Sequence, residues 1–319
     1  MGKRVRKARR KKFLDQHFLF VEFLLIIIVL IFSLDGIFLY YQCQHLKKEN
    51  FTFRKEYHTF SNLYLNKKAE SNNLNKKIKS YQDIDRSIQT IQKKYFSRIK
   101  QLEDDILAHK SDKKIAYLTF DDGPYYNTHK VLDILDQYHV KATFFTISMN
   151  GEYCFDNKSE NCFALYPEYV KRGHTIANHT YTHAIRGGLY RSADSFMDAV
   201  IRQEEHIKTQ TGGYVTNIVR FPGGSAQAKD LKDPIIERLR ERGYGWVDWT
   251  AQDGDGKGIA SWEDGWNTFT SSINDPIEVI LFHDYNRITT EILPSAITYL
   301  EENGYQIYPL FYESNMIQK

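Results

Sequence analysis

The sequence predicts an α/β protein whose main domain is a barrel of parallel strands, preceded by a transmembrane helix and a helical stalk. Three features point to this fold: an apolar run near the N-terminus, a long stretch without Gly or Pro, and β-rich segments that alternate with helical ones from residue 111 onward. We therefore divide the 319 residues into a basic tail at 1–17, an anchor at 18–41, a stalk at 42–110 and a folded domain at 111–319.

The N-terminus has the features of an uncleaved membrane anchor. Residues 2–12 are mostly Lys and Arg, and residues 23–34 are nearly all Leu, Ile, Val and Phe. A span needs about 20 residues, so it must include Glu22 or Asp35 near one edge. The basic flank predicts a cytoplasmic N-terminus and an extracytoplasmic remainder. Because an apolar segment follows it directly, it does not indicate a nucleic-acid partner, and none is expected. A cleaved signal peptide is the alternative, although residues 33–44 contain no small-x-small site.

The stalk is predicted to be helical. Residues 44–110 contain no Gly or Pro, and their apolar residues recur every three or four positions. The helical stripe consists of Ile84, Ile88, Ile91, Tyr95, Ile99, Leu102 and Ile106. Because the spacing departs from a strict heptad, we favour a simple helical spacer, with a dimerising coiled coil (a homodimer) as the alternative.

Cysteines constrain the chemistry only loosely. Cys43 has no evident partner, whereas Cys154 and Cys162 are either joined by a disulfide across a short polar loop or present as two free thiols. There is no Cys-x-x-Cys pair, so a thiolate zinc site is not predicted.

The domain after residue 111 alternates between strand-like and helix-like segments. Strands are predicted at 115–120, 142–147, 175–177, 218–221, 244–249, 279–282 and 305–310, and helices at 128–138, 193–211, 235–242 and 291–303. This alternation indicates βα units and a parallel sheet, and seven strands favour a barrel over an open sheet.

Polar and titratable residues gather where the predicted strands end. They are Asp121, Asp122, Asn178, His179, His183, Arg220, Asp248 and His283, with Gly and Pro beside several of them. The carboxyl ends of parallel strands meet on one face of a barrel, so we expect these residues to form one site.

Two histidines and a carboxylate predict a metal centre in this site. His179 and His183 are four residues apart, and imidazole with one carboxylate gives a three-ligand site that leaves a coordination position open. No Glu follows His179, which excludes the helical motif of zinc metalloproteases. Adjacent residues at a strand end point in different directions, so one of Asp121 and Asp122 can ligate while the other faces the substrate.

These segments resemble the five motifs of one family. Residues 119–124 and 179–183 are similar to the first two motifs of the polysaccharide deacetylase family, also called the NodB-homology domain or carbohydrate esterase family 4. Residues 220–224, 247–249 and 281–283 resemble the third, fourth and fifth motifs, in the family's order. The resemblance covers about residues 113 to 311 and leaves out the anchor and stalk. With these added, the chain resembles membrane-anchored bacterial peptidoglycan N-acetylglucosamine deacetylases.

The resemblance implies a distorted (β/α)7-type barrel and a divalent metal, usually Zn²⁺, held by Asp122, His179 and His183. Asp121 is then expected to be the general base for the attacking water. Arg220 is expected to keep Asp121 ionised and oriented.

The resemblance also implies an acid and a substrate pocket. His283 is expected to be the general acid, with Asp248 orienting it and raising its pKa. The N–H of Gly223, after Pro222, is expected to stabilise the oxyanion, and Trp249 and Leu281 to line the pocket for the acetyl group and sugar.

Four further residues lie close to these motifs. Asp253 and Asp255 are interpreted as turn residues that could approach the groove, and Tyr125 and Tyr126 are candidates for contact with sugar rings.

The expected function is metal-dependent removal of N-acetyl groups from a cell-surface polysaccharide. Peptidoglycan N-acetylglucosamine is the preferred substrate because an extracytoplasmic anchor would place the domain beside that polymer. A chitin-like oligomer, an exopolysaccharide or O-acetylated xylan are alternatives with the same chemistry. A catalytically inactive glycan-binding domain is the rival class, although the expected ligands, base and acid are all present.

Overall fold

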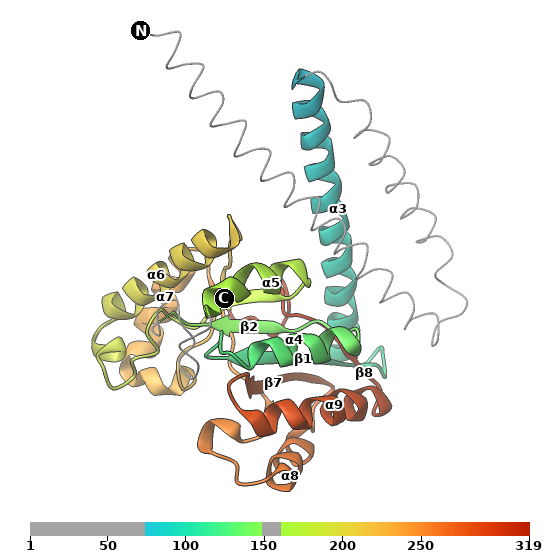
Figure 1. Ribbon diagram of the computed structural model, residues 1–319, viewed down its shortest axis with the longest axis vertical. Coiled ribbons are helices and arrows are strands. Elements are labelled where there is room, and N and C mark those ends of the chain that lie inside the picture. Colours follow the sequence, from blue (N-terminus) through green and yellow to red (C-terminus); the bar gives the residue numbers. More distant parts are fainter. Residues whose placement is uncertain (1–73, 149–160) are drawn as a thin grey trace. The chain divides into compact units, whose positions relative to one another are not determined.

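The computed structural model describes residues 74–148 and 161–319, with side chains described from residue 90 (Figure 1). The predicted tail, the anchor at 18–41 and the first part of the stalk lie outside these residues, as do Cys43 and Cys154. Within the described part of the chain, no helix is both long and apolar enough to cross a membrane. Cys162 is buried and disulfide-bonded.

A parallel sheet forms the centre of the fold, as predicted. Its strands are β1 (Lys114–Asp121), β2 (Thr143–Thr146), β3 (Thr175–Asn178), β4 (Ile218–Val219), β5 (Gly245–Trp246), β6 (Ala251–Gln252), β7 (Ile277–His283) and β8 (Tyr305–Ile307). Their order is β5-β4-β3-β2-β1-β7-β6, and every pairing is parallel. β8 pairs with the first residues of β1, while β2 pairs with its last residues. The described residues thus form eight strands rather than seven, because β6 was not predicted.

Strands β1 and β7 are the two longest strands of the sheet and pair with each other along nearly their whole length. Every residue of β7 is buried, and β1 is buried from its second residue to its last. A strand covered on both faces is expected to consist mostly of apolar residues, as these two strands do.

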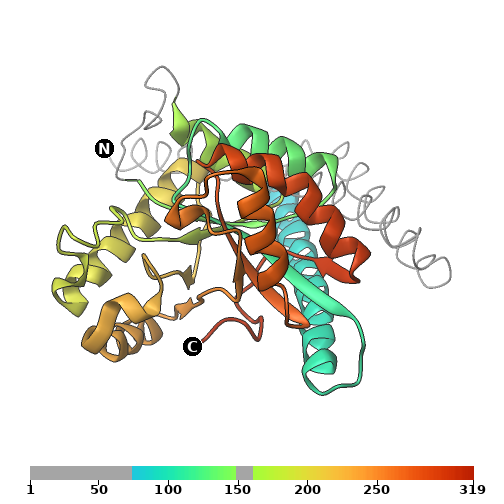
Figure 2. The ribbon, with the colours of Figure 1, turned by 90° about the horizontal axis from the view of Figure 1, so that it is seen from below.

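Helices cover the outer side of the sheet (Figures 1 and 2). They are α4 (Thr128–Gln137), α5 (Leu165–Lys171), α6 (Ala193–Thr211), α7 (Lys232–Glu241), α8 (Trp262–Ser272) and α9 (Arg287–Glu302). α6 packs against α7, α8 against α9, and α4 against both α5 and α9. Two of these helices were not predicted: α5 is only seven residues long, and α8 contains Gly265. This glycine allows close approach to α9, because a Cβ there would collide with Ile292.

The sheet is an open barrel rather than a closed one. β5 and β6 are the two ends of the strand order and are joined by residues 247–250 alone, so the sheet must curve until its edges approach. The C-terminal segment covers the free edge of β5. Trp246 N–H donates to the carbonyl of Gln318 at 2.8 Å, and Gln318 N–H donates back at 2.9 Å. An edge strand is thereby protected from pairing with another chain.

The predicted stalk helix is found as α3 (Leu74–Leu107), and its last turns belong to the same compact unit as the sheet. That unit begins at Phe96, whose ring stacks on Phe311 with 4.8 Å between centroids. Ile99 and Ile106, two members of the predicted apolar stripe, are buried in this unit. The apolar residues at the C-terminal end of the stripe are therefore buried by other residues of the same unit.

Glu103 fixes the end of α3 to the sheet. Its side chain is fully buried, and one carboxylate oxygen accepts hydrogen bonds from Tyr117 in β1 at 2.6 Å and from the Ser314 hydroxyl at 2.5 Å. The other oxygen accepts from the backbone N–H of Asn315 at 2.8 Å. A buried carboxylate is tolerated when its oxygens are satisfied in this way.

We expect Glu103→Ala to lower the free energy of unfolding by about 2–4 kcal/mol, because it leaves buried hydroxyls without an acceptor. Urea denaturation followed by tryptophan fluorescence measures this change. The matched control is Asp104→Ala, which removes a half-exposed carboxylate from the next position and should cost less than about 1 kcal/mol. Equal losses for the two variants would contradict the role of Glu103.

Candidate active site

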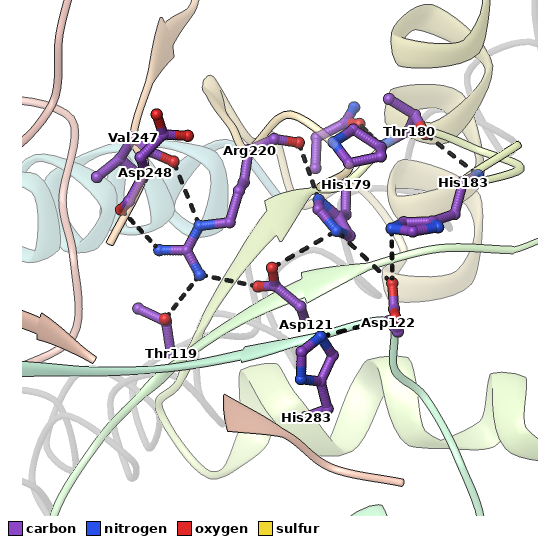
Figure 3. Close-up of polar contacts among 12 residues, drawn as sticks. Thr119, Asp121, Asp122, His179, Thr180, His183, Arg220, Val247, Asp248 and His283 are labelled. Carbon is purple, nitrogen blue, oxygen red and sulfur yellow. Dashed lines mark hydrogen bonds and ion pairs between the residues drawn. The ribbon is translucent and has the colours of Figure 1, made fainter. Parts of the chain in front are cut away.

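The carboxyl ends of the central strands bring the predicted site residues together (Figure 3). Asp121, the last residue of β1, is in register with His283, the last residue of β7, and on the other side with Phe145 of β2. Asn178 ends β3 and pairs with Val219 of β4, one residue before Arg220. Segments distant in sequence therefore meet at one end of the sheet, as the strand-end pattern predicted.

Three side chains form a candidate metal centre. The ligand atoms of Asp122, His179 and His183 lie within 4.8 Å of one another. Asp122 Oδ1 is 3.4 Å from His183 Nε2 and 3.6 Å from His179 Nε2. That oxygen is buried and has no hydrogen-bond partner among the described residues. An orphaned carboxylate oxygen facing two imidazole nitrogens suits a divalent cation.

The tautomer of His179 also suits a metal ligand. Its Nδ1 is 2.9 Å from the backbone carbonyl of Arg220, which can only accept, so Nδ1 carries the hydrogen. Nε2 then presents a lone pair toward Asp122. Burial, reinforced by the charge of His183, lowers the pKa of His179 to about 3. The imidazole is therefore neutral and oriented for coordination.

The backbone around this centre is strained. Asp122, Thr180 and His183 have φ values of 70°, 66° and 49°, in the left-handed region that non-glycine residues avoid. Side chains hold the turn in place: the Asn178 side-chain oxygen accepts from Thr180 N–H at 2.9 Å, and the Thr180 hydroxyl accepts from His183 N–H at 3.3 Å. Such strain is typical of positions where function dictates the geometry.

Arg220 connects the two sides of the site. Its guanidinium is fully buried and donates to the Thr119 hydroxyl at 2.7 Å and to Asp121 Oδ1 at 2.8 Å. It also donates to the carbonyls of Val247 at 3.2 Å and Asp248 at 3.1 Å. Arg220 thus joins β1 to the segment between β5 and β6, and it leaves Asp121 Oδ2 available.

Asp121 lies in a low-dielectric environment. Burial raises the pKa of its carboxyl, whereas the positive charge of Arg220 acts in the opposite direction. The guanidinium is itself packed over the ring of Phe145, 4.1 Å from its centroid. Asp121 is thereby positioned as a buried proton acceptor.

His283 is held by Asp255 rather than by Asp248. Asp255 Oδ1 lies 2.6 Å from His283 Nδ1, and Oδ2 accepts from the backbone N–H of His283 at 2.6 Å. Burial alone would lower the pKa of His283. The hydrogen bond and charge of Asp255, with the charges of Asp122 and Asp121, instead raise it to about 10. The imidazolium form is therefore available as a proton donor.

The prediction that Asp248 orients His283 is wrong. The Asp248 carboxylate accepts from the N–H of Ser225 at 2.9 Å and from its hydroxyl at 2.6 Å, so it fixes the turn after β4. Asp255 reaches His283 because it follows β6, which pairs directly with β7. Only two residues of β6 pair, too few for a sequence pattern, so Asp255 could not be assigned to a strand end.

The turn that carries Asp255 is itself fixed by buried groups. Asp253 Oδ1 accepts from Asp255 N–H at 3.1 Å, and the Thr289 hydroxyl lies 2.8 Å from a carboxylate oxygen of each aspartate. Burial and the neighbouring charge of Asp255 raise the pKa of Asp253 to about 8. Gly256 allows the His283 ring to approach, because a Cβ there would lie 2.9 Å from it.

The remaining predicted residues lie around this centre. Gly223 is exposed with φ 75°, and the carbonyl of buried Pro222 accepts from the Tyr190 hydroxyl at 2.8 Å. The Trp249 ring is next to the same turn, 3.2 Å from where a Cβ of Gly224 would be. Leu281 is buried in β7 and, two residues before His283, points to the same face of the sheet.

Comparisons with known proteins agree with the motif pattern. Residues 108–244 match the polysaccharide deacetylase family. The peptidoglycan-N-acetylglucosamine deacetylase of Bacillus cereus is 28% identical over 214 residues, which cover 64% of this chain and 72% of that protein. The peptidoglycan-N-acetylmuramic acid deacetylase PdaA of Bacillus subtilis is 31% identical over 219 residues, covering 64% and 74%.

A solved structure is also similar to this chain. The catalytic domain of peptidoglycan N-acetylglucosamine deacetylase from Eubacterium rectale superposes with a TM-score of 0.58 and 33% identity. The match covers 65% of this chain and 93% of that domain.

We expect Asp122→Ala to weaken binding of a divalent cation by at least about a hundredfold, more than the loss of a supporting group around a metal site typically causes. Equilibrium dialysis against Zn²⁺ with elemental analysis measures this affinity. Asp121→Asn is the matched control, because Arg220 holds that side chain outside the trio of ligands. Equal losses in the two variants would contradict the assignment of Asp122 as a ligand.

Proposed function

Since this chain belongs to the polysaccharide deacetylase family, we propose that it hydrolyses N-acetyl groups on a cell-surface polysaccharide, with peptidoglycan N-acetylglucosamine as the substrate. One observation supports this most strongly: a buried carboxylate, Asp121, and a buried imidazole, His283, flank the trio of Asp122, His179 and His183. Amide hydrolysis requires a base, an acid and an electrophilic centre in this arrangement.

We propose Zn²⁺ as the metal, with Asp122, His179 and His183 as its ligands. Imidazole nitrogen and carboxylate oxygen are the donors of three-ligand catalytic zinc sites. A bound divalent cation lowers the pKa of water and polarises a carbonyl group.

The protein's own side chains account for the proton movements. Arg220 holds Oδ1 of Asp121, so Oδ2 is the oxygen free to accept a proton from the attacking water. As water adds to the acetyl carbon and the C–N bond breaks, the leaving amine must gain a proton. His283 can donate it from Nε2, because Asp255 occupies Nδ1 and raises the pKa of the ring. The backbone N–H of Gly223 would stabilise the oxyanion.

The same proposal places the domain outside the cell, held by the apolar segment at 18–41. The basic residues before that segment support this orientation. The disulfide at Cys162 also supports it, because disulfides persist in oxidising compartments. An enzyme in this position would act beside peptidoglycan, which is the reason for preferring that polymer over chitin-like oligomers, exopolysaccharides or acetyl-xylan.

We expect the purified protein to release acetate from peptidoglycan, and a chelator to abolish this release until Zn²⁺ is restored. Asp121→Asn should lower kcat by about 10²–10⁴-fold, the usual contribution of a general base. An enzyme-coupled acetate assay measures both effects. Chelator-resistant release would contradict the metal proposal, and full activity of Asp121→Asn would contradict its role as base. Absence of acetate from every acetylated glycan would favour the inactive binding domain.

We expect Asp255→Asn to lower kcat by about 10²-fold or more, because His283 loses the anion that keeps it protonated and oriented. Asp248→Asn should cost less than about tenfold, since an amide can still accept from the Ser225 N–H. Initial rates with one substrate compare the two variants. A larger loss of kcat for Asp248→Asn than for Asp255→Asn would support the sequence-based prediction that Asp248 orients His283.

A further inference from the structure

An exposed tyrosine lies directly beside the proposed acid. Four large apolar side chains are exposed among the described residues: Leu107, Tyr126, Val215 and Tyr285. Tyr285 follows β7 by two residues and is 36% exposed, and Tyr126 follows β1 and is 40% exposed. Single exposed apolar residues are ordinary, but these two are in the loops that follow the strands carrying Asp121 and His283.

The Tyr285 ring is supported on two sides. Its centroid is 5.2 Å from the His283 ring, at an interplanar angle of 44°. It is also 5.2 Å from the ring of Tyr125, in an edge-to-face arrangement of 62°. An aromatic residue that is held by ring neighbours and is still 36% exposed offers apolar surface to a ligand beside the site.

Buried polar side chains tie the two tyrosine-bearing loops together. Thr128 donates from its hydroxyl to Asp284 Oδ2 at 2.5 Å and accepts from Tyr125 N–H at 2.9 Å. The Asn127 amide donates to the Asp284 carbonyl at 3.2 Å and also contacts the Thr290 hydroxyl at 2.5 Å. The side chains of Asn127, Thr128 and Asp284 are at most 2% exposed. The loops are therefore fixed relative to each other before any ligand arrives, which lowers the entropic cost of binding.

We propose that Tyr285, supported by Tyr125, forms a subsite that stacks on a sugar ring adjoining the one that is deacetylated. This inference rests on the proposed function and deepens it, because it names the residue that binds the sugar next to the one that is deacetylated. A pyranose ring has an apolar C–H face that matches an exposed aromatic ring, with hydroxyls at its rim for the phenol.

The position of the subsite follows from the chemistry. His283 Nε2 must reach the amine that leaves the acetylated sugar, so that sugar lies against His283. Tyr285 contacts the same imidazole, so the neighbouring sugar of the glycan chain is expected to lie against Tyr285. Binding energy from such a remote sugar can be used to position the reacting one.

The test compares wild type, Tyr285→Ala and Tyr285→Phe on N-acetylglucosamine and on its dimer and tetramer, measuring acetate release and, by calorimetry, tetramer binding. We expect Tyr285→Ala to lower kcat/KM for the tetramer by roughly tenfold, mainly through KM, as for loss of an aromatic anchor. The monomer should change little, and Tyr285→Phe should stay near wild type. Val215→Ala is the control. It truncates an exposed apolar side chain before β4 and should not change kcat/KM for either the monomer or the tetramer.

The outcomes separate this subsite from the activity. An equal loss for monomer and tetramer would mean that Tyr285 only positions His283, and would overturn the subsite. An unchanged tetramer KM and unchanged tetramer binding in Tyr285→Ala would overturn it as well. If wild type releases no acetate, the proposed function fails, while weaker tetramer binding by Tyr285→Ala still supports the subsite.

Discussion

The buried guanidinium of Arg220 is the interaction on which the site depends. It is fully buried at the end of β4 and donates to two residues of β1 and to two carbonyls in the segment that links β5 to β6. The barrel is open at that segment, so no strand pairing holds it there. Removing one partner of such a buried pair typically costs about 3–5 kcal/mol, because the other charge stays unpaired. Arg220 therefore stabilises the open side of the sheet and the carboxylate of Asp121 together.

The same residue also orients a side chain of the candidate metal centre. The carbonyl of Arg220 accepts from His179 Nδ1 and so selects the tautomer that points Nε2 at Asp122. Its side chain meanwhile holds Oδ1 of Asp121. The backbone and side chain of one buried arginine thus orient the proposed ligand His179 and the proposed base Asp121, whose Nε2 and Oδ2 atoms are 3.5 Å apart. The two roles are coupled, because neither the imidazole nor the carboxylate can shift without disturbing Arg220.

The sequence predicted the parts of this arrangement that long, buried elements produce. β1 and β7 are mostly apolar and end in Asp121 and His283, so the convergence of their ends could be foreseen. Asp255 could not, because β6 has only two residues and its place next to β7 is a tertiary pairing. Asp248 lies in the segment that resembles the fourth motif and was therefore expected to orient His283, but its carboxylate accepts from Ser225 instead. Short strands and long-range pairings carry little local signal.

The two sides of the site are built by different physical means. Around Asp121 and His179, buried charges and fixed hydrogen bonds determine which groups are protonated. The residues that provide them lie in the segments that resemble the family motifs. On the side of Tyr285, the loops are fixed by buried Asn127, Thr128 and Asp284 but expose an aromatic face. Motifs identify the reaction without choosing the glycan. The choice must come from surfaces outside them, and the aromatic ring of Tyr285, 5.2 Å from the ring of His283, is the surface proposed here for that role.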